Sequence, residues 1–500
     1  MRGGLMVCGT ASDVGKSHVV TGLCRLLARG GVKAAPFKAQ NMALNSFVTP
    51  SGHEIGRAQG AQALACRVEP EVAMNPILLK PTGERTSQVV VLGRPLAHLT
   101  AAEYHEHKPR LFATVLDCLA DLRSRFDVVI AEGAGNPAEI NLLEHDIVNL
   151  RLADEAGLPA LVVGDIDRGG VFASLYGTVE LLPAALRARV KGFVVNKFRG
   201  DPALLGAGLD DLERRCGVPA LGVLPWVHDV ALDAEDSLAL TGRRPRAGRR
   251  AVADALDVAV VMLPRMSNFT DLDALAIEPG VGLRLVSDAA SLGDPDLVVL
   301  PGTKATVADL EWLRGRGLDR ALGEARRRGT VALGICGGYQ ILGRRILDDV
   351  ESGRGRSKGL GWLDVDTAFG PRKLTRQRRG RALGQRVTGY EIHHGVTTRG
   401  QEDAWASLDD VYGDEDEGAG DIAGGGVVGT NLHGLFEEDG FRAAFLAAVA
   451  RRRNTDFIPA GVSFVTAREA QFDRLADLLE AHLDVDAVCH LIEQAGSPAP

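Results

Sequence analysis

The chain has no closely spaced cysteine pairs, no long apolar run and no excess of positive charge, and each absence removes a class of protein. Its seven cysteines are scattered from Cys8 to Cys489 without a CxxC pair, which excludes a disulfide scaffold and indicates a reducing compartment. No apolar stretch approaches the roughly 20 residues of a membrane-spanning helix. The first residues lack the apolar region of a signal peptide. We therefore expect a cytoplasmic protein without a membrane partner.

The charge balance argues against a second class of partner. The formal net charge is −8, whereas proteins that bind nucleic acid normally need a basic face to replace the phosphate counterions. No nucleic-acid partner is expected. Apolar residues make up 45% of the chain and charged residues 24%, the balance of an ordinary folded α/β protein. At 500 residues the chain is long enough for two or three domains.

Short apolar runs bounded by turn residues recur along the chain, and they are typical of buried parallel strands. In the first half they occupy 5–9, 127–133, 160–167, 191–198 and 220–226, with helical patterns such as 18–31 between them. A second series lies at 257–263, 283–286, 296–302, 330–338 and 426–434. The alternation predicts an α/β fold class with two doubly wound parallel-sheet domains.

A polar, basic stretch at 236–256 separates the two series and is predicted to be an interdomain linker, with a long surface loop as the alternative. The predicted domains are therefore 1–235 and 257–500. The tail at 467–492 has helical periodicity and is expected to pack on the second domain. The arginine-rich run at 371–382 is expected to be a solvated loop without a function.

A glycine-rich turn lies between the first predicted strand and the first predicted helix, where backbone N–H groups and a helix N-terminus bind phosphates. It reads Gly9, Thr10, Ala11, Ser12, Asp13, Val14, Gly15, Lys16, Ser17. Lys16 is expected to reach the outer phosphates of ATP, and the Ser17 hydroxyl to bind Mg²⁺. Glu132 follows a buried strand and is predicted to be a second Mg²⁺ ligand; a structural glutamate is the alternative.

The turn departs from the usual phosphate loop, because Thr10 stands where the first glycine is expected. Its spacing G-T-x-x-x-x-G-K-S resembles the dethiobiotin synthetase and MinD-like branch of phosphate-loop proteins. The resemblance implies ATP contacts from Gly9, Thr10, Asp13, Val14, Gly15, Lys16 and Ser17. It also implies that Asn196 contacts the adenine, unless it is a turn asparagine. Gln40 and Asn41, with Lys38, are expected to border the phosphates or the substrate.

Cys336 lies in a Gly-Ile-Cys-Gly-Gly turn between a predicted strand and a predicted helix. Such a turn exposes a nucleophile at a helix N-terminus, which favours the thiolate; a buried unreactive cysteine is the alternative. The backbone N–H groups of Gly302 and Gly337 are expected to bind an oxyanion. His433, at the end of a later strand, is the expected base, although a lone histidine there is often structural.

These features resemble class I glutamine amidotransferase domains, which release ammonia from L-glutamine. Most of that class has a glutamate two residues beyond the histidine to orient it, whereas this chain has Leu435 there. Glu437 and Glu438 lie farther on and are the candidates to orient His433, although nothing in the sequence joins them to it. We therefore expect a loosely held histidine without a third partner.

An ATP domain of this type followed by such a glutaminase is similar to the cobyrinic acid amidase family of corrin biosynthesis. The matching segments are 9–17, 37–46, 132–142, 146–149, 263–275, 334–340 and 389–395. The resemblance implies a corrinoid substrate, adenosylcobyrinic acid a,c-diamide, whose b, d, e and g carboxylates are amidated through acyl phosphates. It also implies that Asp146 acts in acyl-phosphate formation, for which a helix N-cap is the alternative.

Two other activities stay open. One is the sister reaction of cobyrinic acid a,c-diamide synthase, which amidates the a and c carboxylates; segments 40–42 and 263–271 favour the four-amide branch. The other is a MinD- or ParA-like ATPase switch. Such switches usually have a second lysine early in the phosphate loop, and Thr10-Ala11 offers none.

Overall fold

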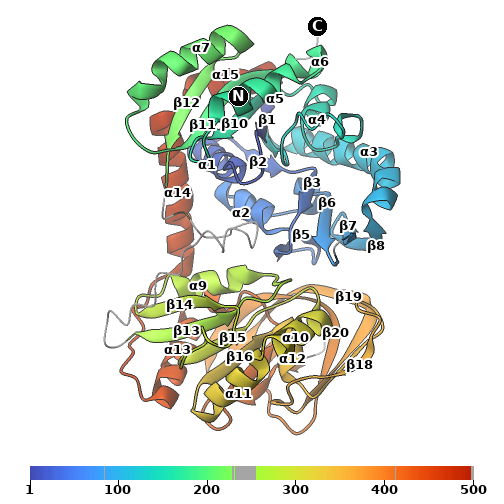
Figure 1. Cartoon of the computed structure of the whole chain (residues 1–500), viewed down its shortest axis with the longest axis vertical. Coiled ribbons are helices and arrows are strands. Elements are labelled where there is room, and N and C mark those ends of the chain that lie inside the picture. Colours follow the sequence, from blue (N-terminus) through green and yellow to red (C-terminus); the bar gives the residue numbers. More distant parts are fainter. Residues whose placement is uncertain (84, 228–229, 231–254, 411–412, 497–500) are drawn as a thin grey trace. The chain divides into compact units, whose positions relative to one another are not determined.

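The computed structural model describes residues 1–83, 85–227, 230, 255–410 and 413–496 (Figure 1). The chain divides into two compact units. Unit 1 takes residues 1–43, 53–232 and 468–500, and unit 2 takes 44–52 and 233–467. The predicted linker at 236–256 lies outside the described residues except for Ala255 and Leu256, and Leu256 already begins a strand.

Unit 1 is built on a six-stranded sheet in which all neighbours are parallel. Its order is β12 (Ala220–Pro225), β11 (Val190–Phe198), β10 (Ala160–Asp165), β1 (Gly3–Gly9), β9 (Val128–Glu132), β2 (Ala34–Phe37). The strands predicted in the first half are all present, and the α/β fold class is confirmed. Short apolar runs identified them because strands buried on both faces contain few polar residues.

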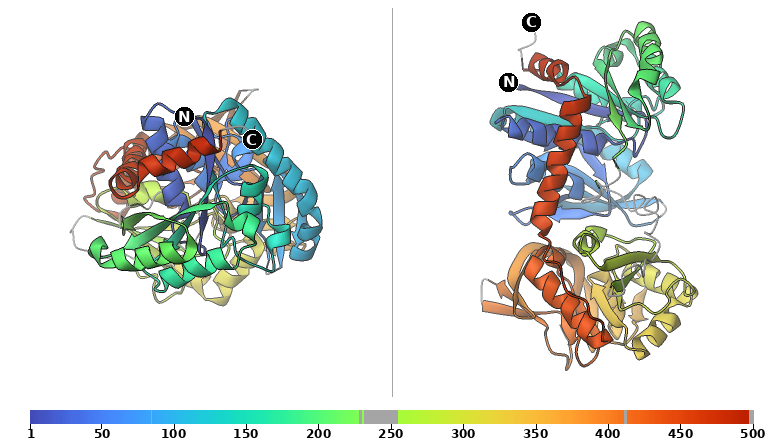
Figure 2. Two further views of the ribbon diagram at one scale, coloured as in Figure 1. Left: turned by 90° about the horizontal axis from the view of Figure 1, so that it is seen from above. Right: turned by 90° about the vertical axis from the view of Figure 1, so that its left-hand side faces the viewer.

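Helices cover both faces of this sheet, as Figures 1 and 2 show. Alternate residues of β1 point to opposite faces, so Met6 belongs to one apolar core and Leu5 to the other. The Met6 core includes residues of α3 (Ala101–Arg125), α4 (Leu150–Glu155), α5 (Val171–Glu180) and α7 (Gly206–Cys216). The Leu5 core includes residues of α1 (Lys16–Arg29) and α2 (Arg57–Ala65). The short α6 (Ala184–Arg187) precedes β11.

A smaller sheet in unit 1 was not predicted. Its order is β3 (Gln40–Met42), β6 (Ile77–Pro81), β7 (Thr86–Val91), β8 (Arg94–Thr100), with β3 parallel to β6 and the other pairs antiparallel. The strand β5 (Glu54–Gly56) precedes α2. Gln40 and Asn41 lie on β3, so this sheet determines where the two predicted substrate-side residues stand.

The C-terminal helices contradict the expectation that they pack on the second domain. Residues of α14 (Phe464–His482) from Arg468 onward, and all of α15 (Val485–Gln494), belong to unit 1. The guanidinium of Arg25 on α1 is 2% exposed and pairs with Asp473 at 2.7 Å and with Glu469 at 2.7 Å. Leu479 and Ile492 join the Leu5 core. The apolar stripes of these helices therefore cover the sheet of unit 1.

Unit 2 contains the second predicted sheet. Its order is β14 (Val281–Val286), β13 (Leu256–Val261), β15 (Leu297–Leu300), β16 (Val331–Ile335), β24 (Val427–Thr430), β23 (Ala419–Asp421). Only β23 runs antiparallel. The α-helices that lie wholly in the described part of this unit are α9 (Asp273–Ala276), α10 (Thr306–Gly315), α11 (Leu318–Arg327), α12 (Gly337–Leu342) and α13 (Asp439–Arg453). The predicted second α/β domain is thus confirmed.

The arginine-rich run is a strand rather than the expected loop. It belongs to β19 (Val365–Ala382), which pairs antiparallel with β20 (Gln385–Arg399). The rest of this sheet is β17 (Arg345–Asp348), β18 (Gly355–Lys358), β21 (Ala406–Asp410) and β22 (Gly413–Glu417). The prediction failed because carboxylates neutralise the arginines: Arg376 pairs with Glu391 at 2.5 Å, and Arg378 with Glu415 at 2.8 Å. A short strand β4 (Ser46–Val48) also belongs to unit 2.

Candidate active sites

The predicted phosphate loop joins β1 to α1 in unit 1. Gly15 has φ +101°, and a Cβ there would lie 2.1 Å from Asn196 Nδ2, so only glycine fits. Lys16 is 7% exposed, and its Nζ donates to the Ala11 carbonyl at 2.9 Å. The Thr10 N–H donates to the Val163 carbonyl at 2.9 Å. The loop is therefore anchored to β10 and keeps the helix N-terminus at the carboxyl edge of the sheet, where phosphates bind.

Asn196 has a structural partner in this loop. Its Nδ2 donates to the Val14 carbonyl at 2.8 Å, and the residue is 7% exposed. Lys197 reaches the same turn, because its Nζ donates to the Asp13 carbonyl at 2.6 Å. The predicted contact of Asn196 with adenine stays a prediction, while its contact with the phosphate loop is direct.

Glu132 ends β9 and is surrounded by donors. Its Oε1 accepts from Ser17 Oγ at 2.9 Å and from Lys38 Nζ at 3.0 Å, and its Oε2 accepts from Gln62 Nε2 at 2.6 Å. Burial alone would raise the pKa of Glu132, but the charge of Lys38 and the hydrogen bonds from Lys38 and Gln62 outweigh burial and lower it. Glu132 is therefore a buried anion at neutral pH.

The two predicted Mg²⁺ ligands are compatible with one ion. Oxygens that bind an octahedral Mg²⁺ at about 2.1 Å and at right angles to each other lie about 3 Å apart, and Ser17 Oγ lies 2.9 Å from Glu132 Oε1. Among the described residues, no group of three or more His, Cys, Asp or Glu side chains could hold a metal. Waters and phosphate oxygens would therefore complete the coordination, as is usual for Mg²⁺.

The predicted substrate-side residues are both held by hydrogen bonds. Gln40 Oε1 accepts from the Tyr104 hydroxyl, and Asn41 Nδ2 donates to Gln59 Oε1 at 2.9 Å. Gln59 and Gln62 lie on α2, which no sequence motif marked. Both glutamines are fully buried; Gln62 contacts Glu132, and Gln59 contacts Asn41.

Asp146 acts as a cap on the segment that leads into α4. Its carboxylate accepts from the N–H groups of Val148 at 2.9 Å and Asn149 at 3.1 Å, and from that of Arg151 at 3.4 Å. The N-cap position of α4 is Asn149, so Asp146 is not the N-cap residue itself; its carboxylate holds the turn that precedes the helix. A role of Asp146 in acyl-phosphate formation stays a prediction.

Cys336 occupies a strained turn in unit 2, between β16 and α12. Its φ of +50° and ψ of −109° are unusual for a residue other than glycine. A Cβ on Gly338 would lie 1.9 Å from the Leu300 carbonyl oxygen, and one on Gly337 would lie 2.6 Å from Thr303 Cγ2. The two glycines therefore allow α12 to start directly against the end of β15. This is the strand-to-helix elbow that the motif predicted.

His433 has an orienting partner that the sequence did not indicate. His433 Nδ1 lies 2.7 Å from Asp271 Oδ2, and Asp271 Oδ1 accepts from the Gly434 N–H at 2.7 Å. The histidine is fully buried, and it hydrogen bonds with the Cys336 thiol. The expectation of a loosely held histidine is therefore wrong. Glu437 and Glu438 were the sequence candidates, and neither is the observed partner of Nδ1.

Asp271 and Cys336 shift the pKa of His433, and His433 in turn shifts the pKa of Cys336. Burial opposes charge on His433, but the carboxylate of Asp271 and the Cys336 sulfur raise its pKa to about 10. Burial would likewise raise the pKa of Cys336, yet the hydrogen bond and charge of His433 outweigh it and lower that pKa. The pair is therefore stabilised as a thiolate and an imidazolium, which is the reactive form of a cysteine nucleophile.

The predicted oxyanion residues lie beside this pair. A Cβ on Gly302 would be 3.0 Å from His433 Cε1, and the backbone N–H of Gly337 hydrogen bonds to the Cys336 sulfur. Gly302 thus lies beside the imidazole of His433, and Gly337 lies beside the sulfur of Cys336. Donation to an oxyanion stays a prediction for each.

Two further residues contact His433, and sequence reasoning missed both. Asn268 Nδ2 lies 3.3 Å from His433 Nε2. The Tyr390 ring stacks on the imidazole, with centroids 5.3 Å apart and planes 22° apart. The segments 263–275 and 389–395 were noted as whole motifs, but nothing local marked these two positions as neighbours of a residue far along the chain.

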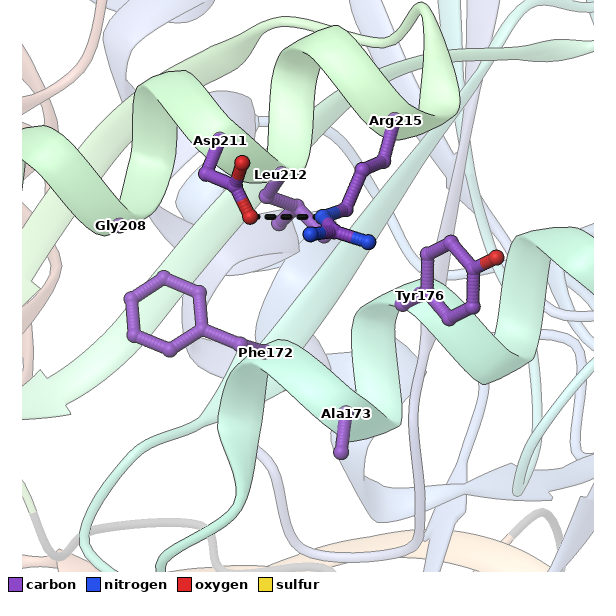
Figure 3. A pocket seen from close by; sticks show the side chains of 7 residues that line it. All are labelled: Phe172, Ala173, Tyr176, Gly208, Asp211, Leu212 and Arg215. Atoms are coloured by element: carbon purple, nitrogen blue, oxygen red, sulfur yellow. Dashed lines mark hydrogen bonds and ion pairs between the residues drawn. The ribbon is translucent and has the colours of Figure 1, made fainter.

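A groove outside both sites lies between α5 and α7 (Figure 3). Phe172 and Tyr176 line it from α5, and Leu212 and Arg215 from α7. Asp211 and Arg215 form an ion pair across one helical turn at 2.6 Å. None of the predicted site residues lines this groove.

Two family models match the chain in the order of the two units. The CobQ/CobB/MinD/ParA nucleotide binding domain matches residues 5–239, and the CobB/CobQ-like glutamine amidotransferase domain matches residues 257–441.

Within the described residues, no helix has the length and apolar character needed to cross a membrane.

Full-length relatives are similar along the whole chain. The cobyric acid synthase of Frankia casuarinae is 53% identical, over 100% of this chain and 98% of the relative. That of Streptomyces avermitilis is 54% identical with the same coverage, and that of Saccharopolyspora erythraea is 54% identical over 99% of this chain and 95% of the relative. Among solved structures, a glutamine amidotransferase matches with a TM-score of 0.31 at 17% identity, covering 40% of this chain and 99% of that one.

Proposed function

This chain belongs to the cobyric acid synthase family, and from that membership we propose that it amidates the b, d, e and g carboxylates of adenosylcobyrinic acid a,c-diamide. It is an ATP-dependent, glutamine-hydrolysing ligase with separate nucleotide-binding and glutamine amidotransferase domains. The observation that carries the proposal is the presence in one chain of a Cys336–His433–Asp271 array and of a phosphate loop facing Glu132.

The glutaminase half-reaction follows from the ionised pair. The Cys336 thiolate attacks the side-chain amide carbon of glutamine, and the N–H groups of Gly302 and Gly337 receive the oxyanion. The His433 imidazolium donates its proton to the departing nitrogen, which leaves as ammonia. Asp271 holds His433 in the required orientation throughout. Water then hydrolyses the thioester and releases glutamate.

The synthase half-reaction uses the buried charges of unit 1. Lys16 and the phosphate-loop N–H groups hold the phosphates of ATP, and the γ-phosphoryl group passes to a corrin carboxylate to give an acyl phosphate and ADP. Mg²⁺, bound at Ser17 and Glu132, would neutralise charge on the phosphates. Lys38 lies 3.0 Å from Glu132 and faces the same site, with Gln40, Asn41 and Asp146 on the substrate side. Ammonia then displaces phosphate and forms the amide.

We also place this activity in the cytoplasm. The proposed reaction consumes ATP and glutamine, which are both supplied in the cytoplasm. All seven cysteines are free thiols, as expected in a reducing compartment.

The decisive test is product mass after incubation with the corrin diamide, ATP, Mg²⁺ and glutamine. A gain of four amides supports the proposal. A gain of two amides on a substrate with free a and c carboxylates, and none on the diamide, would assign the sister activity. ATP hydrolysis without glutamate release, even with corrinoid present, would assign an ATPase switch.

The two-site scheme predicts the behaviour of Cys336→Ala. This variant should lose glutamine-dependent amidation by at least about a thousandfold, because no nucleophile remains, while amidation with free ammonium salts stays near the wild-type rate. Wild-type protein assayed with ammonium salts alone is the control. Loss of both activities in a folded variant would contradict the scheme.

A further inference from the structure

Residues 44–52 belong to unit 2 although the chain on both sides of them belongs to unit 1. The chain leaves unit 1 after Ala43, one residue beyond the end of the strand Gln40–Met42 that carries Gln40 and Asn41, and it returns at His53. This segment is therefore covalently joined to the proposed substrate side of the synthase site, yet it packs as part of the glutaminase unit.

Two reciprocal hydrogen bonds join this segment to the turn that precedes Asp271. The Ser46 N–H donates to Asn268 Oδ1 at 2.9 Å, and the Phe269 N–H donates to Asn45 Oδ1 at 3.1 Å. All of these groups are buried. Asn268 has φ +51°, in the left-handed region that asparagine adopts more readily than most residues.

The supported turn contacts the catalytic histidine at both ring nitrogens. Asn268 Nδ2 lies 3.3 Å from His433 Nε2, and Asp271, three residues on, lies 2.7 Å from His433 Nδ1. A change in the position of Asn45 or Ser46 therefore moves the turn that carries Asp271, which orients His433 through Nδ1, together with Asn268 beside Nε2.

A second route runs from the same segment to the other side of the histidine. The Tyr390 hydroxyl donates to the Ser46 carbonyl at 3.2 Å, and Val48 packs against Tyr390 and Ile392. Gln377 Nε2 donates to the Val48 carbonyl at 2.8 Å. Because the Tyr390 ring stacks on His433, Ser46 touches both neighbours of the imidazole.

We propose that Asn45 is a positioning residue of the glutaminase site, and that segment 44–52 aligns His433 when the synthase site holds its substrates. The inference rests on the proposed function, because it needs glutamine hydrolysis and amidation to occur in one chain. Binding at Gln40 and Asn41 tightens the segment, and the tightened segment holds Asn268 and Asp271 against His433.

The test compares Asn45→Ala with Asn45→Asp in the full chain. Alanine removes the acceptor for the Phe269 N–H, whereas aspartate keeps an acceptor oxygen of the same reach. Glutamate release would be measured without ligands, and with ATP, Mg²⁺ and the corrin diamide. For Asn45→Ala the stimulated kcat/KM should fall about tenfold or more, the cost of leaving a buried N–H without a partner. Asn45→Asp should retain more of the stimulation than Asn45→Ala, because the acceptor is kept although a carboxylate replaces a buried amide.

Amidation with free ammonium salts, measured on the same preparations, separates positioning from damage. It should be unchanged in Asn45→Ala, because Asn45 belongs to unit 2 and accepts from the Phe269 N–H of that unit, whereas the phosphate loop belongs to unit 1. Tyr390→Phe is the second variant: it keeps the ring on His433 but loses the bond to Ser46, and its stimulation should fall by a smaller factor.

Three outcomes would overturn the inference: full stimulation in Asn45→Ala, an equal loss of ammonia-dependent and glutamine-dependent amidation, or a wild-type protein whose glutamate release does not respond to synthase ligands. If Asn45→Ala does not fold, full stimulation in Tyr390→Phe overturns it. Failure of the proposed function looks different, because wild-type protein would then form no amide even from ammonia.

Discussion

The two ring nitrogens of His433 meet different partners. Nδ1 faces the carboxylate of Asp271 at 2.7 Å, and Nε2 faces Asn268 at 3.3 Å. A carboxylate on Nδ1 fixes the tautomer and stabilises the imidazolium, as in other nucleophile–histidine–acid arrays. The acid here precedes both the nucleophile and the histidine in the chain, so it cannot be found by counting from His433.

Asp271→Asn should make Cys336 a weaker nucleophile. Without the carboxylate the pKa of His433 falls from about 10 towards the ordinary histidine value of 6.5. The imidazolium then stabilises the thiolate less, and the pKa of Cys336 rises towards the ordinary cysteine value of 9.0. The rate of alkylation of Cys336 by iodoacetamide rises with pH as the thiolate forms, and in wild type this rise should lie below pH 9. In the variant the rise should move to higher pH, and kcat for glutamate release should fall by up to about tenfold.

Glu437→Gln is the matched control, since Glu437 was the carboxylate nearest in sequence to His433 and is not its partner on Nδ1. Its alkylation profile should coincide with that of wild type. An unchanged profile in Asp271→Asn, or a shifted one in Glu437→Gln, would remove Asp271 from the site.

Asp146→Asn distinguishes the two roles of that residue. Asparagine keeps one oxygen for the N–H groups of Val148 and Asn149 and caps about as well as aspartate, so stability should change by less than about 0.5 kcal/mol. If the carboxylate acts on the substrate, amidation with ammonia should slow about tenfold or more, with basal glutamate release unchanged. Normal amidation would leave Asp146 as a cap alone.

At the scale of single residues, the sequence indicated those candidate site residues that lie inside a recognisable short motif. Cys336 stands in a glycine-flanked turn, and Lys16 and Ser17 stand in a phosphate loop, so neighbouring residues identify them. Asp271, Asn268 and Gln62 were missed because each gains its role from a contact with a residue distant in the chain.

At the scale of elements, the phosphate loop depends on one glycine. Gly15→Ala would bring a Cβ within 2.1 Å of Asn196 Nδ2 and would also impose φ +101° on alanine. The loop must shift, and the KM for ATP in ammonia-dependent amidation should rise at least about tenfold, or about 1.4 kcal/mol.

Gly31→Ala provides the comparison for this change. Gly31 has φ +77° and no atom within 4 Å of an added Cβ, so this variant has the backbone strain of about 1 kcal/mol without the collision. It should lower stability slightly and leave the KM for ATP unchanged. Equal KM values for the two variants would show that the close approach of Asn196 to the loop is unimportant.

Apolar strands were predicted from the sequence, whereas strands with many charged residues were not. Strands buried on both faces, such as β10 and β16, were predicted because only apolar runs suit them. The hairpin of β19 and β20 was missed because Arg376 and Arg378 read as solvated, whereas Glu391 and Glu415 neutralise them across strands. Charge pairing between strands has no signature in a single segment.

At the scale of the whole molecule, unit 1 is closed by helices from the end of the chain. The double variant Glu469→Ala, Asp473→Ala should destabilise unit 1 by about 3 kcal/mol, because it leaves the Arg25 guanidinium buried without a carboxylate. Arg25→Met should cost less, since the carboxylates it leaves behind are 41% and 43% exposed and a thioether packs well. Urea unfolding followed by circular dichroism measures both, and the opposite order would contradict the argument.

The docking of these helices could not be predicted from their own residues. Apolar periodicity in 467–492 showed that one face of each helix is buried. It did not show which sheet receives that face, and proximity in sequence favoured the wrong unit. The partner Arg25 lies at the other end of the chain and carries a charge, which single-sequence reasoning assigns to the surface.

The late arrival of α14 and α15 has a consequence on the ribosome. Chains emerge N-terminus first at about 5–20 residues per second, so the stretch 233–467 occupies roughly 10–50 s of translation. During that interval β1 and α1 are already synthesised, but Leu479 and Ile492, which complete their apolar core, do not yet exist. The nascent ATP-binding unit therefore stays open to chaperones and proteases until the last residues are translated, after the glutaminase unit is complete.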